Sequence, residues 1–139
     1  MYKYNVVVNE REGKIISSMS DITQELANME VSDADHISFK PAPMFSDIEE
    51  FGILKTSRTK GIFKKRLVQD YYLELNFKYP DGKSGLCGHI TLDFDEIKGM
   101  LSNLITHQQL PDISTWIMTT FDVNGKVLPF KEANPHLYQ

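Results

Sequence analysis

The stretch that decides the fold is residues 67–92, LVQDYYLELNFKYPDGKSGLCGHITL. In its first half, every odd position from 67 to 79 except Gln69 is apolar or aromatic. The even positions include Asp70, Glu74, Asn76 and Lys78. A period of two with one apolar side is typical of a half-buried antiparallel strand. We therefore predict a central strand whose odd residues face the core.

The dipeptide Asp81-Gly82 follows this strand and is a strong signal for a two-residue hairpin turn. With these two residues as the turn, Phe77 faces Leu86 and Leu73 faces Ile90 on the apolar side. The same register predicts that Asn76 lies opposite Cys87 and Glu74 opposite His89 on the polar side.

Residues 94–108 predict the main helix. Asp93 and Glu96 have the spacing of a capping box, which satisfies free amide groups at a helix N-terminus. The apolar side chains recur with a period near 3.6 residues, at Phe94, Ile97, Leu101, Leu104 and Ile105. We expect this stripe to cover the odd face of the central strand.

The N-terminal half predicts further strands and a short helix. Residues 2–8 alternate like a strand, and residues 14–17 and 36–40 are strand candidates. Asp21 and Gln24 form a capping box that opens a helix with Ile22, Leu26 and Met29 facing inward. Ser46 and Glu49 repeat the pattern and predict one or two helical turns.

The C-terminal part predicts a second hairpin. Residues 113–121 are β-branched and aromatic, and Asn124-Gly125 offers a tight turn. We expect residues 131–139 to form an irregular C-terminal tail. Residues 1–139 thus predict a single α+β domain: a mostly antiparallel sheet of about five to seven strands, one main helix and one or two short helices.

Charge is distributed unevenly along the chain. The net charge is −4, yet residues 55–66, KTSRTKGIFKKR, carry six cations and no anion. Residues 18–54 carry eight anions and one cation, a net charge of −7. Such separation of charge mainly provides steering and specificity in binding.

These two regions supply the candidate binding residues. We expect residues 55–66 to form a hairpin whose loop, residues 56–61, presents cations to a protein partner or to phosphates. Its candidate residues are Arg58, Lys60, Phe63, Lys64, Lys65 and Arg66. The candidate acidic patch is Asp33, Asp35, Asp47, Glu49 and Glu50. The competing interpretation is that the cations fold back on Asp47, Glu49 and Glu50, or pair across the strands, and carry no function.

Cys87 and His89 are the candidates for catalysis, because a thiol and an imidazole two residues apart share one face of a strand. A nucleophile also requires a group that orients the base, and Glu74 is the candidate for that role. The four histidines, at 36, 89, 107 and 136, do not have the spacing of a metal site, so we predict no metal and no cofactor.

Two aromatic residues are assigned to surfaces away from the predicted core. Tyr72 and Trp116 are residue types enriched at binding hot spots. The alternative is burial under a second layer such as the helix at residues 22–29. We expect burial for Trp116, because Met118 shares its face.

The leading functional hypothesis is a small non-enzymatic binding protein of the inhibitor, immunity or adaptor type. The alternatives are a nucleic-acid-binding protein that uses the basic hairpin and an enzyme that uses Cys87 and His89. A single cysteine and the lack of a long apolar run predict a cytoplasmic protein without a membrane association. Exposed strand edges offer a route to a homo-oligomer.

Overall fold

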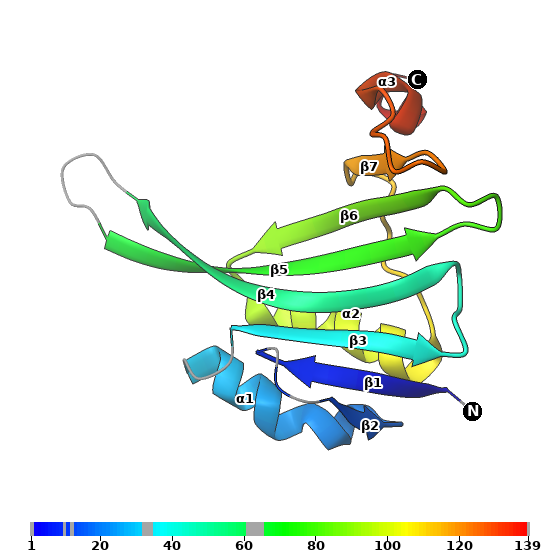
Figure 1. The fold of residues 1–139 in the computed structure, drawn as a ribbon. Coiled ribbons are helices and arrows are strands. Elements are labelled where there is room, and N and C mark those ends of the chain that lie inside the picture. Colours follow the sequence, from blue (N-terminus) through cyan, green and yellow to red (C-terminus); the bar gives the residue numbers. More distant parts are fainter. Residues whose placement is uncertain (1, 10, 12, 32–34, 61–65, 139) are drawn as a thin grey trace.

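A seven-stranded antiparallel sheet forms the centre of the computed structural model (Figure 1). The structure describes residues 2–9, 11, 13–31, 35–60 and 66–138. The strand order is β2-β1-β3-β4-β5-β6-β7. The strands are β1 (Lys3–Val8), β2 (Lys14–Ile16), β3 (His36–Ala42), β4 (Ile48–Lys60), β5 (Arg66–Lys78), β6 (Ser84–Thr91) and β7 (Met118–Phe121).

The two longer helices lie in connections between strands of this sheet. A 3₁₀ turn, η1 (Met19–Ile22), leads into α1 (Thr23–Val31) between β2 and β3, and α2 (Phe94–His107) lies between β6 and β7. Figure 1 shows α2 behind the sheet, and Lys98 of α2 pairs with Glu30 of α1 at 3.9 Å. Both helices therefore cover the same face. The predicted α+β class, strand number and main helix are confirmed.

The core lies between this covered face and the helices. Leu73 and Leu75 of β5 and Phe51 of β4 are fully buried, and so are Ile97 and Leu101 of the α2 stripe. Each such side chain contributes about 1.5–3 kcal/mol through its removal from water. Asp93 caps α2 as predicted, because its carboxylate accepts a hydrogen bond from the Asp95 amide at 3.0 Å. The predicted capping box with Glu96 is not formed, because the Asp93 amide donates to Thr91 and the Glu96 carboxylate contacts His89 and Thr91.

The register of the β5–β6 hairpin differs by one residue from the prediction. Leu75 pairs with Cys87 and Leu73 with His89, so the predicted pairing of Leu73 with Ile90 is wrong. The connection is a three-residue loop: the Gly82 amide donates to the Tyr79 carbonyl, and the Tyr79 amide donates to the Lys83 carbonyl. Gly82 takes a φ of 90°, the left-handed position that follows a type I turn in such hairpins.

The second glycine turn repeats this geometry. The Gly125 amide donates to the Asp122 carbonyl, the Asp122 amide donates to the Lys126 carbonyl, and Gly125 has a φ of 81°. The hairpin is present as predicted, but its first strand, β7, begins only at Met118 and not at residue 113.

Two predicted helix starts are wrong. Ser46 and Asp47 both take positive φ and form a tight turn that leads directly into strand β4, so no helix follows them. The Asp21 carboxylate accepts hydrogen bonds from the amides of Ser17 and Ser18 at 3.2 Å. It therefore caps the start of η1 and does not cap the start of α1. The inward positions Ile22, Leu26 and Met29 are buried as predicted.

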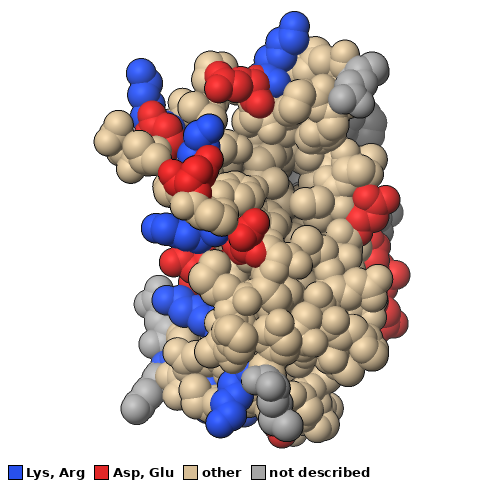
Figure 2. Space-filling view, turned by 90° about the vertical axis from the view of Figure 1, so that its right-hand side faces the viewer, with Lys and Arg blue, Asp and Glu red and all other residues tan. Residues whose placement is uncertain are grey.

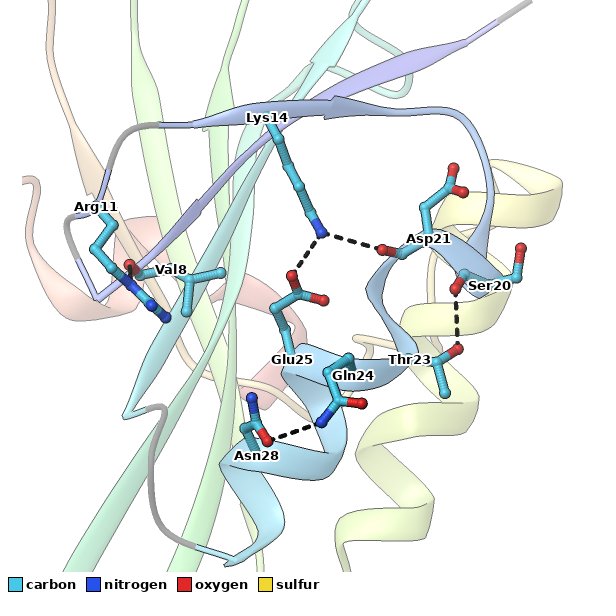
Figure 3. Close-up of polar contacts among 9 residues, drawn as sticks. All are labelled: Val8, Arg11, Lys14, Ser20, Asp21, Thr23, Gln24, Glu25 and Asn28. Atoms are coloured by element: carbon cyan, nitrogen blue, oxygen red, sulfur yellow. Dashed lines mark hydrogen bonds and ion pairs between the residues drawn. The ribbon is translucent and has the colours of Figure 1, made fainter.

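Polar contacts hold α1 against the edge of the sheet (Figure 3). Lys14 of β2 points toward α1, where its ammonium group pairs with Glu25 at 2.5 Å and donates to the Asp21 carbonyl at 3.2 Å. Beyond the sheet's other edge, residues 130–138 form two helical turns, α3 (Phe130–Ala133) and η2 (Pro135–Tyr138), instead of irregular coil. The buried Asn134 holds them to β7 through the backbone amide and carbonyl of Met118.

Candidate functional site

Strands β4 and β5 extend beyond the rest of the sheet. β3 pairs with β4 only as far as Leu54, and β6 pairs with β5 only from Tyr71 onward. The pairs from Thr56–Asp70 to Lys60–Arg66 have no third strand beside them within the described residues. Residues 56–60 and 66–70, which we call the arm, project from the sheet as a two-stranded ribbon (Figure 1).

The arm confirms the predicted basic hairpin and corrects its detail. Residues 56–60 continue strand β4, so the cations there lie on a strand and not on a loop. The backbones of Arg58, Lys60 and Arg66 belong to the arm, but their side chains lie outside the described part of the structure. Phe63, Lys64 and Lys65 lie outside the described residues altogether.

Lys55, the first cation of residues 55–66, is engaged at the base of the arm. Its ammonium group donates to the Met29 carbonyl at the end of α1 at 2.7 Å. Its amide donates to the carbonyl of Asp35, which places one member of the predicted acidic patch beside the arm. Asp33 lies outside the described residues.

The other predicted acidic residues lie at the opposite end of β4. Asp47 occupies the turn before β4, and Glu49 and Glu50 are its second and third residues. At about 3.3 Å per residue, the eleven positions from Asp47 to Arg58 correspond to about 36 Å of strand. An arginine side chain does not reach that far, so the cations of the arm cannot fold back on Asp47, Glu49 and Glu50.

The end of the sheet opposite the arm does not present a uniform acidic surface. Glu50 pairs with Lys40 at 3.9 Å, and Asp81 pairs with Lys83 at 3.9 Å. Figure 2 looks onto this end and shows cations and anions interspersed. The acidic residues between 18 and 54 are therefore divided among several surfaces.

The predicted catalytic pair lies on the covered face of the sheet. Cys87 is only 2% exposed, and burial, together with the charge of Glu74, raises its pKa to about 12. A thiol with this pKa is protonated at neutral pH and is a poor nucleophile. The structure thus offers no activated thiol at Cys87.

The expected partner of His89 is also different. Its Nε2 atom lies 2.6 Å from Oε1 of Glu96 at the start of α2, and its ring stacks on Trp116 at 5.5 Å. Glu74 pairs with Gly88 across the strands, so the predicted pairing of Glu74 with His89 is wrong. The burial of Trp116 is confirmed, at 8% exposure, and the stacked ring of His89 contributes to it.

Tyr72 belongs to the face of the sheet opposite α2, which we call the open face. Neighbouring strands place Leu54 and Ile90 beside it, and both are exposed. A Cβ atom at Gly88 would overlap the Tyr72 hydroxyl, so the ring lies over this glycine. Burial, Glu74 and Cys87 raise the pKa of the Tyr72 hydroxyl, which stays protonated at neutral pH.

Sequence reasoning missed a hollow at the centre of the open face. Its volume is about 160 Å³, and Gly52 contributes to its lining. Its polar lining is provided by His36, Ser38, Glu50, Tyr72, Glu74 and Asn76. Gly52, inside the sequence of β4, was the available signal, because glycine in a strand interior often marks a close approach.

Comparison of the chain with protein-family models, with curated proteins and with solved structures found no match. Within the described residues, no helix combines the length and apolar character needed to cross a membrane.

Proposed function

We propose that this chain is a small non-enzymatic binding protein, of the inhibitor, immunity or adaptor type, whose arm holds an acidic surface of a partner protein. The observation that carries the proposal is the pairing of residues 56–60 with residues 66–70 beyond the last contact with β3 and β6. A two-stranded ribbon is at best marginally stable in water by itself. A partner surface that packs on the arm would supply the missing contacts.

Charge supports the same proposal. The arm and the connection at its tip contain Arg58, Lys60, Lys64, Lys65 and Arg66, and Asp70 is the one acid in this sequence. The acids Asp47, Glu49 and Glu50 are too distant to neutralise these cations. An acidic partner would therefore be attracted to one end of the molecule, which favours fast and oriented association. Such a partner is consistent with a cytoplasmic location.

The test is affinity capture from a native, nuclease-treated lysate with three forms of the chain. The arm variant carries Arg58→Gln, Lys60→Gln and Arg66→Gln. The control variant carries Lys78→Gln, Lys83→Gln and Lys126→Gln, which removes the same charge from hairpins outside the arm. We expect the wild type and the control to retain a common protein partner, and the arm variant to bind that purified partner at least tenfold more weakly.

Equal retention of the partner by all three forms would contradict the role of the arm. Nucleic acid is the second candidate, because residues 55–66 combine six cations with Phe63. Fluorescence anisotropy with single- and double-stranded nucleic-acid probes at low salt distinguishes a nucleic-acid ligand from a protein partner. Binding whose salt dependence decreases in the arm variant but not in the control would assign the arm to phosphates instead of protein.

A further inference from the structure

The hollow on the open face is created by the residue order across three neighbouring strands. Ser38 of β3 pairs with Gly52 of β4, and Gly52 pairs with Glu74 of β5. Because Gly52 has no side chain, the surface between Ser38 and Glu74 is depressed. A volume of about 160 Å³ exceeds the roughly 30 Å³ that a water molecule occupies, so a small chemical group fits.

The carboxylates of Glu74 and Glu50 are hydrogen-bond acceptors in the hollow, and their contacts with other side chains are long. Glu74 accepts from the Asn76 amide at 3.3 Å, and Glu50 is 3.9 Å from the Lys40 ammonium group. Ser38 is only 8% exposed, and its hydroxyl makes no hydrogen bond to any described residue. The Ser38 hydroxyl belongs to the lining of the hollow and can accept or donate one hydrogen bond to a group that enters it. Ser38 therefore points to a polar ligand.

The composition of the lining selects among cations. The described residues contain no group of three or more histidine, cysteine, aspartate or glutamate side chains able to hold a metal ion, which disfavours a divalent metal here. Two carboxylates favour a cation with several N–H donors, and the ring of Tyr72 at the margin provides a surface on which a planar cation stacks. A guanidinium group has both properties, since it is planar, always charged and able to bind a carboxylate through two hydrogen bonds.

We propose that the hollow between Ser38, Glu50, Tyr72 and Glu74 binds a guanidinium group. Glu74 is the bidentate acceptor at the floor, Glu50 supplies the second negative charge, and Ser38 accepts one further N–H group. The exposed Leu54 lies in the same lining and offers an apolar surface to the methylene chain that carries the group. The guanidinium comes either from a small molecule such as free arginine or from an arginine side chain of a protein.

This site is distinct from the arm, and the proposal does not depend on the function proposed for the arm. The hollow is lined by residues of β3, β4 and β5 where these three strands lie side by side, whereas the arm consists of residues 56–60 and 66–70. Loss of binding at one site therefore leaves the other testable.

The experiment is a titration of the full chain with methylguanidinium chloride, followed by backbone amide chemical shifts. Methylurea has a similar shape without the charge and serves as the neutral control, and sodium chloride controls for ionic strength. We expect saturable shifts at residues 38, 52, 74 and 88 with methylguanidinium at millimolar concentration, and none of comparable size with methylurea or sodium chloride. Shifts that are equal for all three compounds, or that do not saturate, would overturn the proposal.

Variants link the binding to the hollow. Glu74→Gln and Glu50→Gln keep the size of the side chain and should each weaken binding at least tenfold, and Tyr72→Leu should weaken it severalfold. Glu49→Gln removes the same charge from the neighbouring residue, which does not line the hollow, and should leave binding unchanged. An equal effect of Glu49→Gln and Glu74→Gln would show that methylguanidinium is attracted by the overall negative charge and not by the hollow, and would contradict the proposal.

Two further titrations identify the source of the group. Free arginine and a Gly-Gly-Arg-Gly-Gly peptide with blocked termini carry the same guanidinium on different frames. Tighter binding of the peptide assigns the site to a protein side chain, and tighter binding of free arginine assigns it to a small molecule. Failure of both to compete with methylguanidinium would contradict the site.

Discussion

The two faces of the sheet are built from alternate residues of the same strands, yet they differ in almost every physical property. On β4 and β5, the covered face presents Phe51, Leu73 and Leu75, which are fully buried. The open face presents Gly52, Tyr72 and Glu74, which line a hollow. The covered face thus provides the stability of the fold, while the open face keeps polar groups available for a ligand.

The arm extends this contrast along the strands. Between Phe51 and Leu54, β4 is held by β3 and β5, whereas residues 56–60 pair with β5 alone. The two proposed binding surfaces therefore consist of side chains and strand segments that do not pack in the core. A surface that does not contribute to stability is free to carry charge, glycine or polar side chains.

Leucines on the two faces provide the largest test of this contrast. Leu73→Ala removes a fully buried side chain under α2 and should lower the free energy of unfolding by about 2–5 kcal/mol. Leu54→Ala, at a residue that is 39% exposed on the open face, should lower it by less than about 1 kcal/mol. Urea denaturation monitored by circular dichroism measures both, and similar losses would show that the open face is also part of the core.

The reactivity of a cysteine on each face provides the second test of the contrast. The pKa of about 12 for Cys87 leaves far less thiolate at pH 8 than an ordinary cysteine, whose pKa is about 8.5. Native Cys87 should therefore react with iodoacetamide about a thousandfold more slowly than the new thiol of Leu54→Cys in a Cys87→Ala background. Rapid labelling of native Cys87, with labelling unchanged by unfolding in urea, would contradict its burial.

Two tyrosines offer a matched pair with a smaller effect. On the covered face, the Tyr4 hydroxyl donates to the carbonyl of Ile105 at 3.0 Å and accepts from Gln108 at 3.1 Å. Tyr4→Phe should cost about 1–2 kcal/mol, because buried polar groups at the end of α2 lose a partner. Tyr72→Phe on the open face should cost less than about 0.5 kcal/mol. Thermal unfolding of both variants measures the difference in stability. A larger loss of stability for Tyr72→Phe would contradict the view that the covered face, and not the open face, stabilises the fold.

The covered faces of β5 and α2 were predicted well from the sequence. Apolar periodicity identifies both elements, because burial of one side imposes a period on the sequence. The two faces of β6 were exchanged in the prediction, because the side on which its residues lie depends on register. Asp81-Gly82 and Asn124-Gly125 occupy the end of three-residue loops, and the dipeptide alone does not distinguish these from two-residue loops.

That single residue of register decides where the candidate chemistry lies. It moves Cys87 and His89 to the covered face and places Gly88 beside Glu74, where the ring of Tyr72 covers this glycine. Other differences have a similar cause. Ser46 begins a turn with positive φ although its spacing to Glu49 matches a capping box, and the C-terminal turns depend on Asn134 bonded to the distant Met118. Contacts between distant residues are not encoded in local sequence patterns.

The smallest expected effect concerns the ion pair between Lys14 and Glu25, which holds α1 at the edge of the sheet. Burial acts to raise the pKa of Glu25, but the hydrogen bond and charge of Lys14 act against it, and the pKa is lowered overall. Because the folded-state pKa lies below the ordinary value of about 4.3, the pair stabilises the fold above that pH. This contribution is lost as the pH falls through the folded-state pKa.

Lys14→Met should therefore lower the free energy of unfolding by at most about 1 kcal/mol at pH 7, since the Lys14 side chain is 47% exposed and screened by water. As the pH falls below the lowered folded-state pKa of Glu25, protonation of Glu25 should remove most of the difference between variant and wild type. Lys126→Met, at an exposed lysine of the last hairpin, is the control and should not show this pH dependence. A difference that persists when Glu25 is protonated would assign the role of Lys14 to its hydrogen bond with the Asp21 carbonyl instead of to the ion pair.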